Sequence, residues 1–170
     1  AQSQARALAA IAAGRLAEEI VPITVGEGKR AQTVAQDEHP RPGTTAEALA
    51  KLSTVFGPDS FVTGGNASGI VDGAAMLLLS SAARAAELGK KPLGRLISWA
   101  VVGVEPSRMG IGPAPAIRAA LAKAGIGLAD LDLIEINEAF AGQILACVRE
   151  LGLDEAKLNV DGGAIALGHP

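Results

Sequence analysis

Apolar runs of strand length alternate with helical patterns from Phe61 onward, and this alternation restricts the possible folds more than any other feature of the sequence. A short, continuously apolar run such as Met76 to Leu79 is typical of a strand buried on both faces of a sheet. Strands that alternate with helices in this way are typical of an α/β domain. The predicted strands are 61–63, 76–79, 93–104 and 131–137, and the predicted helices are 70–75, 81–88, 114–124 and 138–151.

The first 60 residues follow a different pattern. Apolar residues recur at helical spacing over about 3–19, and Pro22 ends this predicted helix. Residues 21–25 and 30–35 are β-like runs on either side of a Gly-Glu-Gly-Lys turn, so we expect a hairpin there. The remaining predictions for this part are a stiff, proline-containing loop at 37–43 and a helix through Leu52 that opens on a capping box at 44–47.

Composition excludes several classes of protein. The 170 residues are 49% hydrophobic, which is enough for a sizeable core, and the net charge of −3 offers no basic field for nucleic acid or an anionic membrane. The N-terminal residues lack the pattern of a secretory signal, and the longest strongly apolar run, 74–79, is too short to span a bilayer. Cys147 is the only cysteine, which excludes an internal disulfide and fits a reducing compartment. We therefore expect a soluble, cytoplasmic protein.

Two segments present residues suited to catalysis. The last twelve residues place an apolar run between two glycine-rich turns and end on Gly168-His169-Pro170. Gly168 can adopt backbone angles closed to other residues, and Pro170 favours an extended His169, so the imidazole is presented from a tight bend. Such a bend suits a catalytic histidine, but an ordinary exposed turn histidine is the commoner reason for this pattern. Asn137 lies between a predicted strand and a predicted helix, where asparagine can serve as a catalytic amide or simply as a helix cap.

Four stretches together resemble the signature motifs of the thiolase family, in the family's order and at about its spacing. These stretches are Gly-Asn-Ala-Ser-Gly at 65–69, Met-Gly-Ile-Gly-Pro at 109–113, Asn-Glu-Ala-Phe-Ala at 137–141 and Asn-Val-Asp-Gly-Gly-Ala-Ile-Ala-Leu-Gly-His-Pro at 159–170. The resemblance covers most of the chain from Asp37 onward. It also implies that the chain is a fragment, because thiolases have a nucleophilic cysteine in an N-terminal region that is absent here and a second cysteine in a motif that would follow Pro170. We expect this chain alone to be inactive.

The resemblance refines the expected fold to an incomplete thiolase-like layered α/β fold. Residues 1–60 correspond to the tail of the loop region that contributes to the coenzyme A site. Residues 61–80 correspond to the end of the N-terminal core domain, and residues 81–170 to a partial C-terminal core domain.

The resemblance also implies roles for seven residues. His169 and a water held by Asn137 hydrogen-bond the thioester oxygen, and His169 helps to activate the nucleophilic cysteine. The residues implied to bind substrate are Arg41, Thr44 and Ser68 for coenzyme A, and Met109 and Phe140 for the wall of the acyl pocket. From the residues alone, Arg41 can be a solvated charge, Ser68 part of a structural turn and Met109 ordinary packing.

Two other residues are excluded from the predicted chemistry. His39 matches no catalytic position of the family, and we expect it to be a surface loop residue. Cys147 matches neither catalytic cysteine and lies on the apolar face of the predicted helix 138–151, where burial would raise its pKa and disfavour nucleophilic attack.

The implied reaction is the thiolytic cleavage of a 3-oxoacyl-CoA to acetyl-CoA and a shortened acyl-CoA, which in reverse is a Claisen condensation. Coenzyme A is a substrate, and we expect no other cofactor and no metal. The parent most resembles a 3-oxoacyl-CoA thiolase, with a biosynthetic acetyl-CoA C-acetyltransferase, a non-catalytic acyl-CoA- or lipid-binding relative and a ketosynthase-like enzyme as alternatives. Thiolases are dimers or tetramers, so we expect a homo-oligomer.

Overall fold

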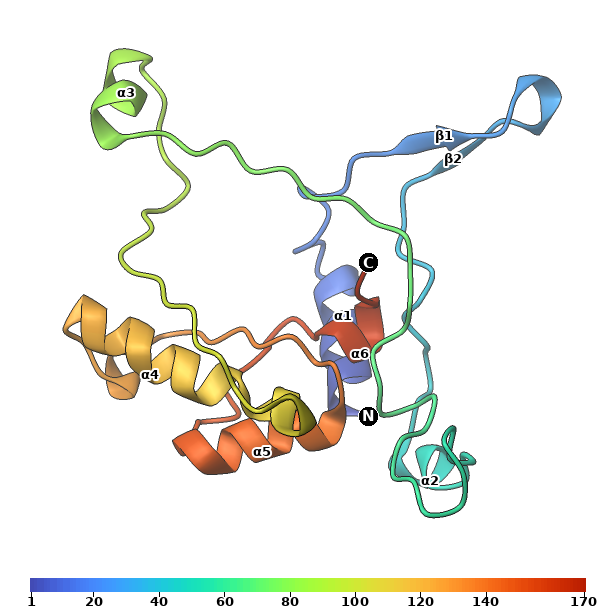
Figure 1. Ribbon diagram of the computed structural model, residues 1–170. Coiled ribbons are helices and arrows are strands. Elements are labelled where there is room, and N and C mark those ends of the chain that lie inside the picture. Colours follow the sequence, from blue (N-terminus) through green and yellow to red (C-terminus); the bar gives the residue numbers. More distant parts are fainter.

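The structure is a computed structural model that describes residues 1–170 (Figure 1), and it contains six α-helices, three 3₁₀ helices and one pair of strands. The elements in chain order are α1 (Gln2–Ala12), β1 (Ile23–Val25), η1 (Gly28–Arg30), β2 (Gln32–Val34), α2 (Ala46–Leu49), α3 (Ala82–Glu87), η2 (Pro106–Ile111), α4 (Pro113–Ala124), η3 (Leu128–Asp130), α5 (Ala141–Leu151) and α6 (Ala164–Leu167).

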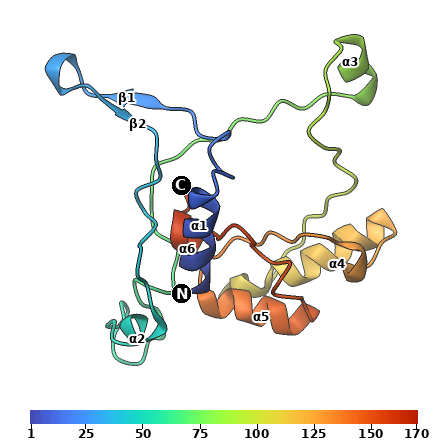
Figure 2. The ribbon, with the colours of Figure 1, turned by 180° about the vertical axis from the view of Figure 1, so that it is seen from behind.

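The first and last helices lie side by side at the centre of the molecule, near both termini (Figures 1 and 2). Ala7 and Ala10 of α1 are fully buried, and the small alanine side chains let the two backbones approach closely. The Gln4 side-chain amide of α1 donates to the carbonyl of Ile165 in α6 at 3.4 Å. The short helix α6 was not predicted, because four residues carry too little helical periodicity to be distinguished from an extended apolar run.

A small hydrophobic core lies against α4 and α5. Its five buried residues are Ile134, Ile136, Cys147, Leu153 and Leu158. Residues near Ile134 and Leu158 form a parallel bridge, in which Ile134 N–H donates to the carbonyl of Lys157 and Asn159 N–H donates to the carbonyl of Ile134, both at 2.9 Å. The predicted strand 131–137 is therefore extended, but it has only this single bridge.

Three predictions for residues 70–104 are wrong in this structure. The helix at 70–75 and the strands at 76–79 and 93–104 are absent, and Figure 1 shows this part of the chain as a long open excursion with α3 near its far end. Their apolar side chains face solvent, with Leu78 98% and Val101 88% exposed. A strand requires a neighbouring strand to satisfy its backbone groups, and no segment of the 170 residues pairs with these runs.

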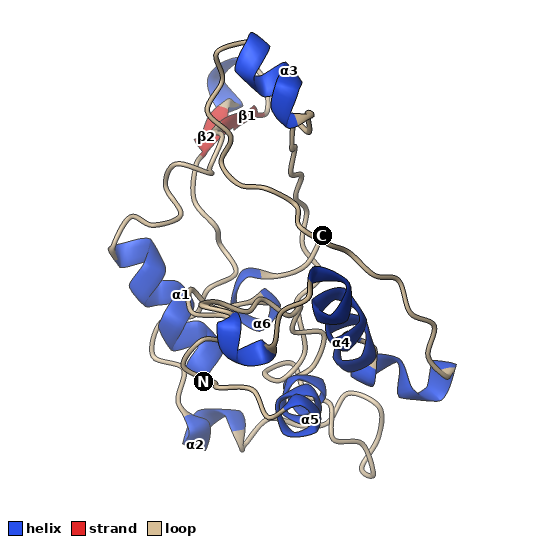
Figure 3. Ribbon diagram, turned by 90° about the vertical axis from the view of Figure 1, so that its left-hand side faces the viewer, coloured by secondary structure: helices blue, strands red, loops and turns tan.

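The predicted hairpin is present and supplies the only sheet, coloured as strands in Figure 3. Antiparallel pairing of β1 and β2 joins Ile23 to Val34, Thr24 to Thr33 and Val25 to Gln32. Gly26 at the end of β1 has φ +86°, which a residue with a side chain rarely adopts. All six strand residues are exposed, and the hairpin projects from the helical part of the molecule (Figure 1).

Helix ends follow the local sequence signals in part, since α2 ends at Leu49 and not at the predicted Leu52. Thr45 accepts a hydrogen bond from Ala48 N–H at 3.2 Å and caps α2, and Gly125 and Gly152 end α4 and α5 in the left-handed conformation. The first helix is shorter than predicted, because the chain leaves α1 at Ala13 and reaches a left-handed glycine, Gly14 at φ +71°.

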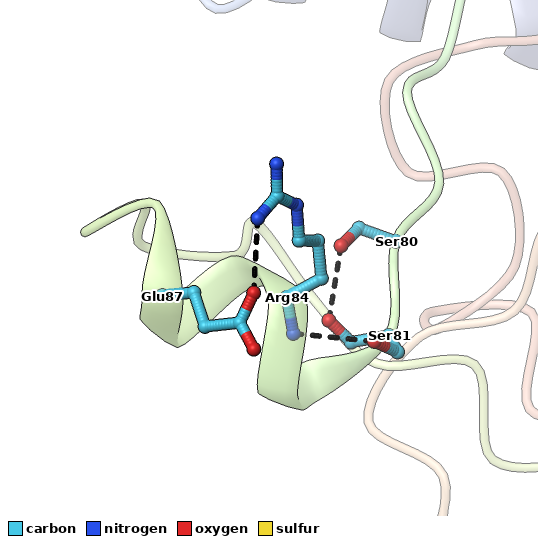
Figure 4. A network of polar contacts seen from close by, with 4 residues as sticks. All are labelled: Ser80, Ser81, Arg84 and Glu87. Atoms are coloured by element: carbon cyan, nitrogen blue, oxygen red, sulfur yellow. Dashed lines mark hydrogen bonds and ion pairs between the residues drawn. The ribbon is translucent and has the colours of Figure 1, made fainter.

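The exposed helix α3 is held by its own polar side chains (Figure 4). Ser81 caps it by accepting from Arg84 N–H at 3.2 Å, and the Arg84 guanidinium pairs with Glu87 at 2.9 Å. The Ser80 hydroxyl donates to the Ser81 carbonyl at 3.0 Å. These contacts are local in sequence, so α3 needs no tertiary support for them.

None of the helices has the length and apolar character required to cross a bilayer.

Replacing Gly162 by alanine should separate α1 from the segment that leads into α6. Gly162 has φ +87°, and a Cβ there would lie 2.7 Å from the Ala7 Cβ and 2.8 Å from the Ser3 carbonyl oxygen. The left-handed backbone costs about 1–2 kcal/mol with a side chain, and the clash adds about 1–3 kcal/mol. Gly125→Ala is the matched control, since Gly125 is also left-handed but nothing lies within 4 Å of its Cβ position. Urea unfolding should show the larger loss of stability for Gly162→Ala, and equal losses would contradict this packing.

Candidate functional site

Three loops that are distant in sequence meet in the molecule: 66–69, 137–141 and 163–169. The first two are joined by two backbone hydrogen bonds, from Ser68 N–H to the Ala139 carbonyl at 3.0 Å and from Ala141 N–H to the Asn66 carbonyl at 2.8 Å. An isolated antiparallel bridge pairs Ala67 with Phe140. The structure therefore brings the loops that carry Ser68, Phe140 and Asn137 together.

The third loop reaches the same place through His169. Its backbone N–H donates to the carbonyl of Gly69 at 3.0 Å, directly after Ser68. The preceding Gly168 has φ +85°, as the sequence predicted for this bend, and a Cβ there would lie 2.5 Å from the Val71 side chain. The imidazole itself is exposed. The backbone around His169 is thus fixed while its ring remains accessible.

Asn137 is an exposed residue between two buried ones, Ile136 and Glu138. Helix α5 begins at Ala141, and its N-cap residue is Phe140, which makes no side-chain capping bond. The capping interpretation of Asn137 is therefore wrong, because three residues separate it from the helix. Its carboxamide makes no hydrogen bond within the chain, so it is free to hold a water or a substrate atom.

Three buried polar residues beside these loops, Ser3, Glu138 and Asn159, form a cluster that was not predicted from the sequence. Asn159, at φ +46°, donates to the Ile136 carbonyl and accepts from the Ile136 N–H, each at 2.9 Å. The Glu138 carboxylate accepts from the Ser3 hydroxyl at 2.5 Å and from Ile165 N–H at 3.1 Å. The available sequence signal was motif membership, since Glu138 lies within the stretch 137–141 and Asn159 opens the stretch 159–170.

Arg41 and Thr44 lie in a loop that is attached to the same region. Arg41 N–H donates to the Gln4 side-chain oxygen at 2.8 Å, and the Thr44 hydroxyl donates to the Arg41 carbonyl at 2.8 Å. Backbone contacts thus fix this loop against α1. The Arg41 guanidinium is exposed and has no ion pair or hydrogen bond within the chain, so it can bind an external anion.

His39 is not the surface loop residue that we expected. It is half-buried, with Nδ1 2.8 Å from the Ala166 carbonyl, and a Cβ added at Gly69 would collide with its ring. Because a carbonyl only accepts, Nδ1 carries the proton in this contact. The imidazole therefore fills the space between α6 and the 66–69 loop, a non-local contact that no local pattern predicts.

Met109 lies outside the three loops and makes no hydrogen bond to them. It lies in η2, and its side chain is largely exposed. The connection is indirect: a Cβ at neighbouring Gly110 would lie 2.8 Å from Gln143, in the first turn of α5. The role of Met109 in the pocket wall stays a prediction.

Cys147 is a core residue, as the sequence predicted. Its side chain is 0% exposed, and the thiol donates to the Gly110 carbonyl at 3.4 Å. Desolvation by burial raises the pKa of the Cys147 thiol above its usual value. A thiol that is buried and protonated cannot act as a nucleophile.

No three histidine, cysteine, aspartate or glutamate side chains of the chain cluster in a way that could hold a metal ion.

Two family profiles match nearly the whole chain. The profile described as the thiolase N-terminal domain matches residues 1–83, and the one described as the thiolase C-terminal domain matches residues 90–170. The chain belongs to the thiolase family, and its structure is a partial thiolase-like α/β fold.

Individual relatives agree with this assignment. Acetyl-CoA acetyltransferase of Pseudomonas aeruginosa is 57% identical over 171 residues, which cover 100% of this chain and 44% of that protein. The crystal structure of the Bacillus anthracis acetyl-CoA acetyltransferase superposes with a TM-score of 0.96 at 51% identity, covering 99% of this chain and 43% of that one. The crystal structure of human mitochondrial 3-ketoacyl-CoA thiolase in complex with CoA superposes with a TM-score of 0.93 at 52% identity, covering 99% of this chain and 42% of that one. The chain thus spans less than half the length of these relatives.

The burial of Cys147 makes a chemical prediction. Because its pKa is raised and its sulfur is shielded, iodoacetamide at pH 8 should alkylate Cys147 very slowly in the folded protein and rapidly in urea. Mass spectrometry of the peptide that contains Cys147 measures both rates. Rapid alkylation without denaturant would contradict its assignment to the core.

Proposed function

We propose that this chain is a segment of a thiolase that cleaves 3-oxoacyl-CoA to acetyl-CoA and a shortened acyl-CoA. The observation that carries the proposal is the meeting of the 66–69, 137–141 and 163–169 loops, which places the backbones of Ser68, Asn137 and His169 in one region. Membership of the thiolase family and the names of the relatives support the same reaction.

In the proposed reaction, a cysteine thiolate supplied from outside these 170 residues attacks the 3-oxo carbon, because Cys147 is buried. The bond between carbons 2 and 3 breaks, and its electron pair passes to the thioester as an enolate. His169 and a water held by Asn137 stabilise the charge on the thioester oxygen. A second cysteine, also supplied from outside these 170 residues, gives its proton to carbon 2 and releases acetyl-CoA, and the thiol proton of the incoming coenzyme A restores that cysteine. The thiol of a second coenzyme A then takes the acyl group from the first cysteine. Coenzyme A is a substrate throughout, and the scheme uses no metal or other cofactor.

Substrate binding in this proposal uses residues at the edge of the same region. Arg41 offers an unpaired guanidinium to a phosphate, and Ser68 offers a hydroxyl to the pantetheine arm of coenzyme A. Thr44 supports the Arg41 loop through its bond to the Arg41 carbonyl. Phe140 and Met109 would form part of the acyl pocket wall.

An acetyl-CoA C-acetyltransferase is the second candidate, favoured by the 57% identity to the Pseudomonas aeruginosa protein. The two candidates use the same catalytic groups and differ in the length of the acyl chain. Comparing acetoacetyl-CoA with longer 3-oxoacyl-CoA substrates in the full-length protein distinguishes them. A cytoplasmic homodimer or homotetramer is proposed from the family resemblance, and analytical ultracentrifugation of the full-length protein tests the oligomeric state.

His169→Ala in the full-length protein should lower kcat by about 10²- to 10³-fold, because one donor to the developing oxyanion is lost. The affinity for coenzyme A should stay nearly unchanged, since the imidazole acts at the thioester and not on the coenzyme. Steady-state thiolysis gives kcat, and calorimetry gives the affinity. Kinetics equal to those of the wild type would refute the role of His169.

Arg41→Ala should weaken coenzyme A binding about tenfold through the loss of a charge-assisted bond, and Ser68→Ala about fivefold through the loss of a neutral one. The matched controls are Arg84→Ala and Ser80→Ala, which remove the same groups from the exposed region of α3. Isothermal titration calorimetry measures the affinities. Unchanged binding in the first pair of variants, or equal losses in both pairs, would contradict the assignment.

A further inference from the structure

Glu138 is a buried carboxylate at the point where the catalytic loops meet. Its side chain is 7% exposed, and all its hydrogen bonds come from donors. Oε2 accepts from the Ser3 hydroxyl at 2.5 Å and from the Ile165 N–H at 3.1 Å, and Oε1 accepts from the Asn159 side-chain amide at 3.3 Å. Burying a carboxylate costs free energy unless hydrogen-bond donors satisfy it. This site therefore requires a side chain whose two terminal atoms both accept hydrogen bonds.

The three donors belong to different parts of the fold. Ser3 lies in α1, Asn159 follows the parallel bridge with Ile134, and Ile165 is in the first turn of α6. The Ile165 N–H has no carbonyl partner within α6, because first-turn N–H groups precede the helical repeat. Glu138 supplies the missing acceptor and so fixes the start of the helix that leads to His169.

The backbone around Gly163 is adapted to this carboxylate. A Cβ at Gly163 would lie 2.5 Å from Cδ and 2.7 Å from Oε2 of Glu138, so only glycine permits the observed approach. The Gly163 N–H also donates to the Ser3 hydroxyl at 3.1 Å, which in turn donates to Glu138. The carboxylate is thus in contact with the His169 loop both directly and through Ser3.

We propose that Glu138 is a positioning residue for the thiolase reaction: its carboxylate, covalently next to Asn137 and hydrogen-bonded to α6, sets the distance between the Asn137 amide and the His169 imidazole. This inference rests on the proposed function, because it concerns those two catalytic groups. Glu138 does not touch the substrate. It acts by fixing the two loops that do, and a displacement of about 1 Å in such groups can cost about 100-fold in rate.

Glutamine has the shape of glutamate but cannot replace it here. The Asn159 amide is fixed in orientation, because its oxygen accepts from the Ile136 N–H and its nitrogen donates to the Ile136 carbonyl. A glutamine at 138 therefore turns its NH₂ group either toward the Asn159 NH₂ or toward the Ile165 N–H. Either orientation opposes two donors and pushes the loops apart with no change in side-chain volume.

The test is Glu138→Gln in the full-length protein, assayed for thiolysis, coenzyme A affinity and melting temperature. We expect kcat to fall about 10- to 100-fold, with the affinity for coenzyme A within about threefold of the wild type. Ser3→Ala should have a smaller effect in the same direction, since it removes one of the three donors. A kcat within twofold of the wild type would overturn the proposal.

Two controls separate positioning from simple destabilisation. Glu135→Gln removes the same charge from an exposed position three residues away, and Leu153→Ala weakens the hydrophobic core without removing a hydrogen bond of Glu138. Both should keep kcat near the wild-type value at a temperature where they are folded. If Leu153→Ala and Glu138→Gln lower the melting temperature equally and also lower kcat equally, the role of Glu138 is only structural and the proposal fails.

His169→Ala, measured in parallel, distinguishes failure of the positioning role from failure of the proposed function. If His169→Ala is inactive while Glu138→Gln is fully active, the positioning role fails and the proposed function stands. If His169→Ala is fully active, the proposed function fails, and with it the reason to assign Glu138 a part in catalysis.

Discussion

The buried contact between Glu138, Asn159 and the start of α6 is the constraint on which the rest of the site depends. It joins α1, the extended segment at 134–138 and the loop that carries His169. An acceptor withdrawn from water must be satisfied by donors at fixed positions, so these hydrogen bonds specify geometry more sharply than apolar packing of the same area. The loops that surround the proposed thioester site are the ones that this cluster orders.

The molecule divides into a well-packed region and an open one. Helices α1, α4, α5 and α6 enclose the buried residues, whereas residues 70–104 expose long apolar side chains such as Leu78 and Val101. The chain matches less than half of its relatives' length. Apolar runs of this kind are stable only when strands beside them pair with their backbones and helices cover their faces. The proposed site lies on the packed side, where its geometry is internally supported.

In the proposed chemistry, exposed side chains act on the substrate and the buried thiol does not react. His169 and Asn137 are exposed and make no side-chain hydrogen bonds within the chain, so both can act on a substrate. Each follows a residue whose backbone is hydrogen-bonded, Ile136 for Asn137 and Gly168 for His169. Cys147 shows the opposite arrangement, since burial raises its pKa and shields its sulfur. The only thiol of the chain therefore contributes to packing. The groups proposed to act on the substrate are the His169 imidazole and the Asn137 amide.

The sequence alone determined the features that depend on a few neighbouring residues. The hairpin, a helix start within 44–47, the bend at Gly168 and the thiolase motifs were predicted, because each is set by local backbone preferences or by motif identity. Only the tertiary structure decided whether apolar runs became strands, that Asn137 is not a helix cap, that His39 packs against α6, and that Glu138 and Asn159 join the loops. These outcomes depend on which partner lies opposite in space, and a linear pattern does not contain that information.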